Sequence, residues 1–158
     1  MQVRLQQLPA SRVAYLRHIG PYGLGVHQFW MNTVLPWQQA QGLIGRTCYG
    51  IGHDDPHVTK ADKCRYDACV ALPPGYAPPA DMLTMTIPGG LYAVYDFRGG
   101  VPEIAQAWTA LFAEWLPASG WGVDARPCFE FYPEDAFFDP ATGEFSCQIC
   151  LAVRPLNS

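Results

Sequence analysis

The clearest hydrophobic pattern in the chain lies between residues 101 and 115. Apolar side chains recur there every three or four residues, as one face of a helix requires: Val101, Ile104, Ala105, Trp108, Leu111, Phe112 and Trp115. Pro102 suits the first turn of this helix, and Gly120 follows its end. Pro36 is expected to kink or end early a second, weaker helix, whose apolar face comprises Val26, Phe29, Trp30, Thr33, Val34 and Trp37.

Runs of aliphatic and aromatic residues bounded by Pro and Gly predict strands in both halves of the chain. The most distinct runs are RVAYLRH at 12–18 and LYAVYDF at 91–97. Shorter or less regular runs predict further strands at 2–7, 46–52, 64–72, 82–87, 126–132 and 145–153. The intervening sequence PPGYAPPAD, at 73–81, is rich in Pro and predicts a linker.

The two halves of the chain resemble each other. Residues 8–20 align with 87–99, and the motif from Trp30 to Gly42 aligns with the motif from Trp108 to Gly120. Two later matches pair residues 46–49 with 126–129 and residues 69–71 with 150–152. The matches keep their order along the chain with nearly constant spacing, which indicates an internal duplication of a β-β-α-β-β unit.

These elements predict an α+β fold in which an antiparallel sheet carries one main helix from each repeat. The first repeat spans about 2–74 and the second about 82–155, joined by the linker 73–81. The length suits a single domain, 1–158. We expect a pseudo-twofold axis between the repeats and a ligand cleft where they meet, since such interfaces are favoured ligand positions.

Composition narrows the classes of function. With 49% hydrophobic and 15% charged residues the chain is typical of a globular protein, and no apolar run approaches the roughly 20 residues that span a bilayer. The N-terminus lacks the apolar core of a secretory signal, so we expect a cytoplasmic protein without a membrane partner. A net charge of -4 and scattered Lys and Arg residues disfavour direct nucleic acid binding.

The residues that could bind a metal have simpler interpretations. Cys147 and Cys150 form a C-x-x-C motif, but residues three apart on a strand point to opposite faces of the sheet. The run HDDPH, from His53 to His57, suits a turn at a strand end. The six cysteines are expected to be reduced thiols. We therefore predict neither a metal nor a cofactor.

Several segments together resemble the gyrase-inhibitory-protein-like (GyrI-like) family: IGHDDPHVT, CRYDACVALP, TIPGGLYAVYDFRG and ARPCFEFYPED. That family includes the stand-alone gyrase inhibitor of enteric bacteria and the effector-binding domain of Rob-type AraC regulators. The resemblance runs from about residue 3 to residue 155 and implies the same duplicated architecture. Since no helix-turn-helix fits before Val3, the chain resembles the free-standing form.

The resemblance also implies a site. Members of the family are associated with an aromatic-lined cleft that has a glutamate at its base and suits hydrophobic cations, and the matching position is Glu130. From the residues alone two interpretations stay open. Strand alternation would turn Phe129 and Phe131 inward and Glu130 to water. However, its same-face neighbours Cys128 and Tyr132 are not typical of a solvated face.

The repeat adds to the second interpretation, because the residue matching Glu130 in the first half is Gly50. An acid where the other half has no side chain suggests a functional difference between the halves. Burial of Glu130 would raise the pKa of its carboxyl group. Six aromatic residues are candidates to line a pocket around it: Trp108, Phe112, Tyr92, Tyr95, Phe97 and Tyr66. Core packing is the alternative role for Trp108, as for its counterpart Trp30.

Three functions remain open at this stage. The domain could bind small hydrophobic, often cationic compounds as an effector-binding or drug-sequestering protein. As the resemblance implies for some members, it could instead hydrolyse cyclopropane-bearing or other strained electrophiles with Glu130 as the catalytic acid or base. It could also inhibit DNA gyrase as a protein partner. The chain lacks the G-x-S-x-G, phosphate-loop and H-E-x-x-H motifs of the commonest catalytic sites.

Overall fold

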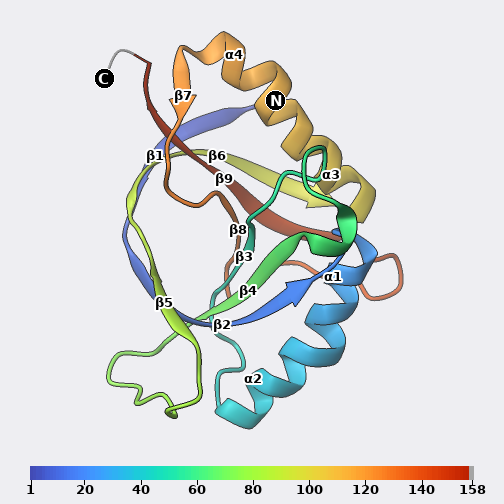
Figure 1. The fold of residues 1–158 in the computed structure, drawn as a ribbon, viewed down its shortest axis with the longest axis vertical. Coiled ribbons are helices and arrows are strands. Elements are labelled where there is room, and N and C mark those ends of the chain that lie inside the picture. The colour runs from blue at the N-terminus through green and yellow to red at the C-terminus, as the bar shows by residue number, and fades with distance from the viewer. Residues whose placement is uncertain (157–158) are drawn as a thin grey trace.

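The computed structural model describes residues 1–156, in which a curved antiparallel sheet of nine strands is flanked by two long helices (Figure 1). The α+β fold is thereby confirmed. The predicted domain limit at residue 158 lies outside the described residues. The strands are β1 (Val3–Leu8), β2 (Ser11–Ile19), β3 (Cys48–Gly52), β4 (Arg65–Ala71), β5 (Thr84–Ile87), β6 (Gly90–Gly99), β7 (Trp121–Val123), β8 (Phe129–Tyr132) and β9 (Phe145–Pro155).

The strand order is β1-β6-β9-β8-β3-β4-β2-β5, with β7 paired to β9. This order reads the same from either end when the strands of the two halves are matched by position, as an internal duplication predicts. The central pair is then β3 and β8. The first strand of each half is exchanged, since β1 pairs with β6 and β5 pairs with β2.

Each long helix is made of three consecutive segments. The helix of the first half comprises α1 (Leu24–Phe29), the π-helical η1 (Trp30–Val34) and α2 (Leu35–Gln41); the helix of the second half comprises α3 (Val101–Ala110), the π-helical η3 (Leu111–Trp115) and α4 (Leu116–Ser119). A short 3₁₀ turn, η2 (Ala61–Lys63), precedes β4. Both long helices end at a glycine with left-handed backbone angles, Gly42 (φ 70°) and Gly120 (φ 80°).

The first helix does not end early at Pro36, because it continues to Gln41. A proline clashes with the carbonyl four residues earlier, which is Asn32 here. Asn32 lies in the π-helical segment, whose wider winding changes the spacing at that carbonyl. Pro117 in the second helix has the same relation to its own π-helical segment.

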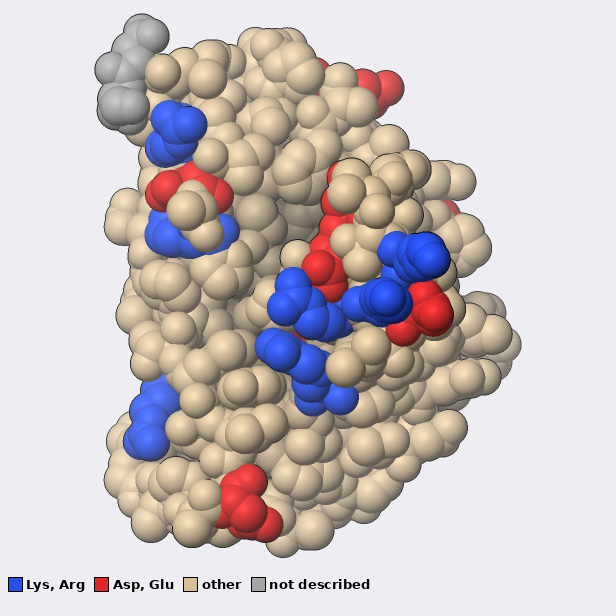
Figure 2. Space-filling model, viewed as in Figure 1, with Lys and Arg blue, Asp and Glu red and all other residues tan. Residues whose placement is uncertain are grey.

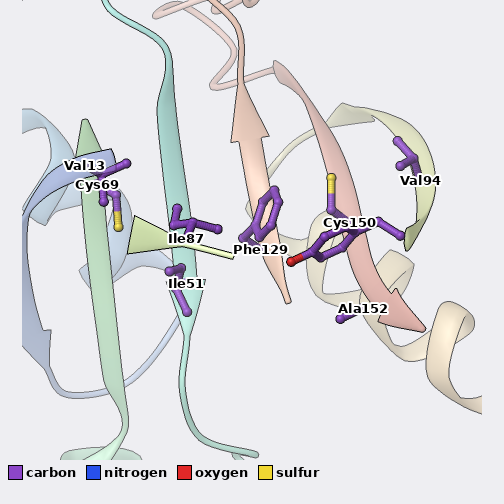
Figure 3. Packing of buried hydrophobic residues seen from close by; sticks show 9 residues of the cluster. Val13, Ile51, Cys69, Ile87, Val94, Phe129, Cys150 and Ala152 are labelled. Carbon is purple, nitrogen blue, oxygen red and sulfur yellow. The ribbon is translucent and has the colours of Figure 1, made fainter. Parts of the chain in front are cut away.

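The two faces of the sheet bury different sets of side chains. One face, which we call the inner side, packs against itself across the curve of the sheet (Figure 3); its buried residues are Val13, Ile51, Cys69, Ile87, Tyr92, Val94, Phe129, Cys150 and Ala152. The other face, the helix side, packs Leu111 against Phe97, Cys147 and Ile149, and Val34 against Tyr66 and Ala68. Cys147 and Cys150 therefore lie on opposite faces, as predicted.

Two further features concern the helices and the surface charge. Within residues 1–156 no helix has the length and apolarity that crossing a bilayer would need. On the face shown in Figure 2, Lys and Arg lie in small groups, mostly beside Asp or Glu, and wide areas carry no charge.

Candidate functional site

Glu130 lies at the centre of the sheet, on β8, directly opposite Gly50 on β3. Its neighbours Phe129 and Phe131 pack on the inner side, as strand alternation predicts. The side chain of Glu130 therefore points to the helix side, between the two long helices. The interpretation that this residue faces bulk water is wrong, because helix residues cover that side of the sheet.

Both carboxylate oxygens of Glu130 accept hydrogen bonds from neutral aromatic side chains. The indole N–H of Trp108, on α3, donates to Oε2 over 2.8 Å, and the hydroxyl of Tyr132 donates to Oε1 over 2.9 Å. Burial raises the pKa of Glu130, and these two hydrogen bonds offset only part of the increase. Among residues 1–156 no Lys, Arg or His forms an ion pair with this carboxylate. Glu130 is thus a partly buried acid without a counter-charge.

Tyr66, on β4, brings a second polar group beside this acid. A Cβ atom added to Gly50 would overlap the Tyr66 hydroxyl and would lie 3.3 Å from Oε1 of Glu130. The hydroxyl therefore lies over the backbone of Gly50, next to the carboxylate. It accepts a hydrogen bond of 3.0 Å from the indole N–H of Trp30. Burial, and then the charge of Glu130, raise the pKa of Tyr66 well above its usual value.

Aromatic rings from both halves meet above Glu130. The ring of Trp30, on the first long helix, lies edge-on to Tyr132 of the second half at 5.8 Å and to Tyr66 at 6.5 Å. We call Trp30, Tyr66, Trp108 and Tyr132 the aromatic cluster. It surrounds the carboxylate with rings from two helices and two strands.

The structure brings together most of the predicted site residues. Trp108 and Tyr66 belong to the aromatic cluster, and Phe112 stacks on Trp108 at 6.1 Å while remaining 44% exposed. Tyr95 and Phe97 lie on the helix side in the same apolar group as Trp108.

The prediction that Tyr92 lines the site was wrong. Its ring belongs to the buried group on the inner side, where its hydroxyl donates to the carbonyl of Pro88. Tyr92 is an odd number of residues from Tyr95 and Phe97 on the same strand, so it points to the opposite face. It cannot share a pocket with Glu130.

Two residues of the aromatic cluster were missing from the predicted site, Trp30 and Tyr132. Each carried a signal that could have found it. Trp30 is the repeat counterpart of Trp108, and Tyr132 lies two residues after Glu130 on the same strand, hence on the same face.

The ligand cleft expected between the halves stays a prediction. The described residues form one surface hollow of about 440 Å³ between His57 and the outer face of α3, and another of about 380 Å³ near Met1 and Trp115. Glu130 lines neither hollow. Glu130 and the rings of Trp30, Trp108 and Tyr132 lie between the halves, and each of these side chains remains partly exposed.

A separate group of polar side chains, centred on Asp67, fixes the position of the loop after β3. The carboxylate of Asp67 is fully buried and accepts two hydrogen bonds from Arg17, at 2.8 and 3.0 Å. The Nε2 atom of His53 lies 2.6 Å from Oδ2 of the same carboxylate. Burial would raise the pKa of Asp67, but the hydrogen bonds from Arg17 and His53 outweigh it and lower the pKa. Asp67 thus has a hydrogen-bonding role in holding this loop.

The HDDPH run is a turn, as its sequence suggests. Asp54 accepts two hydrogen bonds from the guanidinium group of Arg65, and Asp55 accepts one from the backbone N–H of His57. These residues fix the path of the loop between β3 and β4.

Known proteins resemble this chain in sequence or in fold. A DNA gyrase inhibitor of Edwardsiella piscicida is 32% identical over 160 residues, which cover 98% of this chain and 99% of the inhibitor. The C-terminal domain of EcmrR superposes with a TM-score of 0.74 at 16% identity, with 98% of each chain covered. In the complex of EcmrR with DNA, this chain spans 58% of the EcmrR chain.

Two further solved structures have the same fold at low identity. SAV2435, bound to tetraphenylphosphonium, has a TM-score of 0.61 at 19% identity, with 99% of this chain and 96% of that chain covered. A hydrolase from Listeria innocua has a TM-score of 0.60 at 10% identity, with 97% and 92% covered. The model of the GyrI-like small molecule binding domain matches residues 1–154. With this match over nearly the full length, the chain belongs to the GyrI-like family of small-molecule-binding domains.

Proposed function

We propose that this domain binds hydrophobic organic cations at the aromatic cluster, with Glu130 as the counter-charge. The observation that carries the proposal is the environment of Glu130, a partly buried carboxylate with two neutral donors and four surrounding rings. Within residues 1–156 it forms no ion pair. A cation placed there restores the charge balance of the site. The binding of SAV2435 to tetraphenylphosphonium supports the same class of ligand for this chain.

The energetics of such a site favour cations that are themselves apolar. An uncompensated buried charge is costly, and part of this cost is recovered when an opposite charge arrives. Each aromatic ring that meets the cation face-on adds about 0.5–2 kcal/mol. A neutral ligand of the same shape gains the apolar contacts but neither of these electrostatic contributions.

Trp30 joins the two halves of the proposed site. Since Trp30 contacts both Tyr66 and Tyr132, its indole bridges the two halves above the carboxylate. A ligand at the aromatic cluster therefore contacts rings of both halves. Large apolar ligands that reach both sets of rings are favoured.

Calorimetric titration tests the proposal with two probes of similar shape, the cation tetraphenylphosphonium and the neutral triphenylphosphine oxide. We expect Glu130→Gln to weaken the cation about tenfold or more, since it removes the counter-charge, and to leave the neutral probe within about twofold. Glu103→Gln, an exposed acid in the first turn of α3, is the matched control. Equal weakening of both probes by Glu130→Gln, or no binding of the cation to the unsubstituted protein, rejects the proposal.

A second candidate function is hydrolysis of a strained electrophile. The fold is shared with a protein described as a hydrolase from Listeria innocua, and a carboxyl group with a raised pKa suits proton transfer near neutral pH. Incubation with a panel of cyclopropane-bearing compounds should then give repeated turnover that Glu130→Gln abolishes while binding survives. Consumption of no more than one equivalent would reject this function.

Inhibition of DNA gyrase is a third candidate, supported by relatives that are named DNA gyrase inhibitors. The measurement is gyrase supercoiling of relaxed plasmid at increasing molar excess of the protein. Supercoiling that stays unchanged at a large excess would remove gyrase as a partner.

A further inference from the structure

In each half of the protein a large residue lies beside a small one at the centre of the sheet. In the first half Gly50 lies beside Tyr66; at the matching positions of the second half Glu130 lies near Cys147. The two arrangements complement each other. Glu130 lies on the β8 side of the central β3–β8 ladder. On the β3 side, the Tyr66 hydroxyl occupies the space that the missing side chain of Gly50 leaves.

The hydrogen bond from Trp30 determines which hydrogen-bonding role remains for the Tyr66 hydroxyl. An indole N–H can only donate, so the bond from Trp30 uses the Tyr66 oxygen as an acceptor. The hydroxyl hydrogen is then available for a further acceptor. Among residues 1–156 no group accepts it. Tyr66 is 5% exposed, and a buried donor without an acceptor costs free energy that an incoming acceptor would recover.

From this geometry we infer that Tyr66 is a specificity-determining residue, which selects cationic ligands that carry a hydrogen-bond acceptor close to the charged centre. The inference rests on the proposed function, since Glu130 must hold the cation. In the favoured ligand class a protonated amine donates to Glu130 while a neighbouring hydroxyl, ether or carbonyl oxygen accepts from Tyr66. Gly50 is the positioning residue, because any side chain there would push the hydroxyl away from the acid.

The hydroxyl keeps its hydrogen under all ordinary conditions. The neighbours of Tyr66 include Glu130, Cys147, Trp30 and Tyr22, and its cross-strand partner on β2 is His18. Burial and the nearby carboxylate both disfavour ionisation of the phenol. Tyr66 is therefore a donor toward the ligand throughout the physiological pH range.

The test uses a matched pair of amines, 1,2-diphenylethylamine and 2-amino-1,2-diphenylethanol, which differ by one hydroxyl group. In calorimetric titration we expect the unsubstituted protein to bind the amino alcohol about fivefold more tightly, as suits one neutral hydrogen bond. Tyr66→Phe should abolish this preference, so that the two amines bind with equal affinity. Tyr92→Phe removes a buried hydroxyl from the opposite face of the sheet and should retain the preference.

The outcomes of this titration distinguish the role of Tyr66 from the proposed cation binding. Equal affinities of the two amines for the unsubstituted protein, or a preference that survives Tyr66→Phe, overturn the role of Tyr66. If tetraphenylphosphonium and both amines fail to bind the unsubstituted protein, the proposed function itself is overturned. Should Tyr66→Phe unfold, Gly50→Ala replaces it. This variant displaces the hydroxyl but keeps the tyrosine, and we expect it to lower the preference to below about twofold.

Discussion

At the residue scale, the two hydrogen-bond donors to Glu130 differ in whether they can also accept a hydrogen bond. The Trp108 indole can only donate, so Oε2 must remain an acceptor, whereas the Tyr132 hydroxyl can donate or accept. A proton on Glu130 is therefore restricted to Oε1, with Tyr132 reversing its role. The same reasoning means that glutamine fits this site with both hydrogen bonds kept, its oxygen toward Trp108 and its amide toward Tyr132.

Glu130→Gln should stabilise the free protein at neutral pH. Because burial raises the pKa of Glu130 in the folded state, ionisation disfavours the fold above that pKa and has no effect below the ordinary pKa of a glutamate. We expect a gain of about 1 kcal/mol at pH 7, or roughly 2–4 °C in Tm, that disappears near pH 4. Thermal unfolding across pH measures it, and a loss of stability at pH 7 would contradict the stated environment of the acid.

Cation affinity should follow the same ionisation. Only the carboxylate form attracts a cation, so affinity for tetraphenylphosphonium should rise with pH through the raised pKa of Glu130 and level off above it. Glu130→Gln should remove the pH dependence. A flat profile for the unsubstituted protein over pH 4–8 would be inconsistent with Glu130 as the counter-charge.

At the scale of elements, Asp67 joins three strands at the end of the sheet that faces the β3–β4 loop. It lies on β4, Arg17 comes from β2, and His53 directly follows β3. A buried carboxylate that loses its main partner keeps its desolvation cost. The stability of this loop and the placement of Tyr66, one residue before Asp67, are thus linked.

Arg17→Gln should destabilise the protein by about 2 kcal/mol at pH 7, with Arg12→Gln on the same strand as the control. The lowered pKa of Asp67 means that this stabilisation is present above the ordinary pKa of an aspartate and is lost as the pH falls through the lowered value. The difference between the variant and the unsubstituted protein should therefore shrink in acid. Urea unfolding at pH 7 and near pH 3 measures it; a pH-independent difference would point to packing instead.

The elements themselves were largely predictable. Apolar spacing located both helices and eight strands, because each has one buried face whose period appears directly in the sequence. Two features had no such signal. The π-helical segments keep helical spacing on both sides, so only the prolines that follow them hint at the change in winding. Strand β7 is three residues long and carries too little pattern to be recognised.

At the scale of the molecule, the sheet depends on exchange between the halves. Each half gives its first strand to the other, and the central β3–β8 ladder joins Cys48, Tyr49 and Gly50 to Tyr132, Phe131 and Glu130. Residues 1–78 and 79–158 expressed separately should each lack ordered structure by circular dichroism, since each leaves a long sheet edge unpaired. Mixing the two pieces should restore the native spectrum. A cooperatively folded single half would contradict this interdependence.

The position of the candidate site followed from the repeat, but the neighbours of its acid did not. Matching Glu130 with Gly50 located a break in symmetry, and the sheet places that pair at its centre. Which helix side chains cover the acid depends on how the helices lie across the strands, and alternation along one strand contains no information about that. Trp30 and Tyr132 were therefore missed as neighbours, and Tyr92 was assigned to the wrong face.

The central pair of Gly50 and Glu130 has a consequence for how such a protein can evolve. Two identical subunits could build the same sheet by trading strands, but every substitution at the axis would then occur twice. A glutamate would face a second glutamate, and mutual repulsion would expel one or both from the interior. Joining the copies in one polypeptide frees each to mutate alone, so a solitary negative charge at the centre is a property that only the fused chain can have.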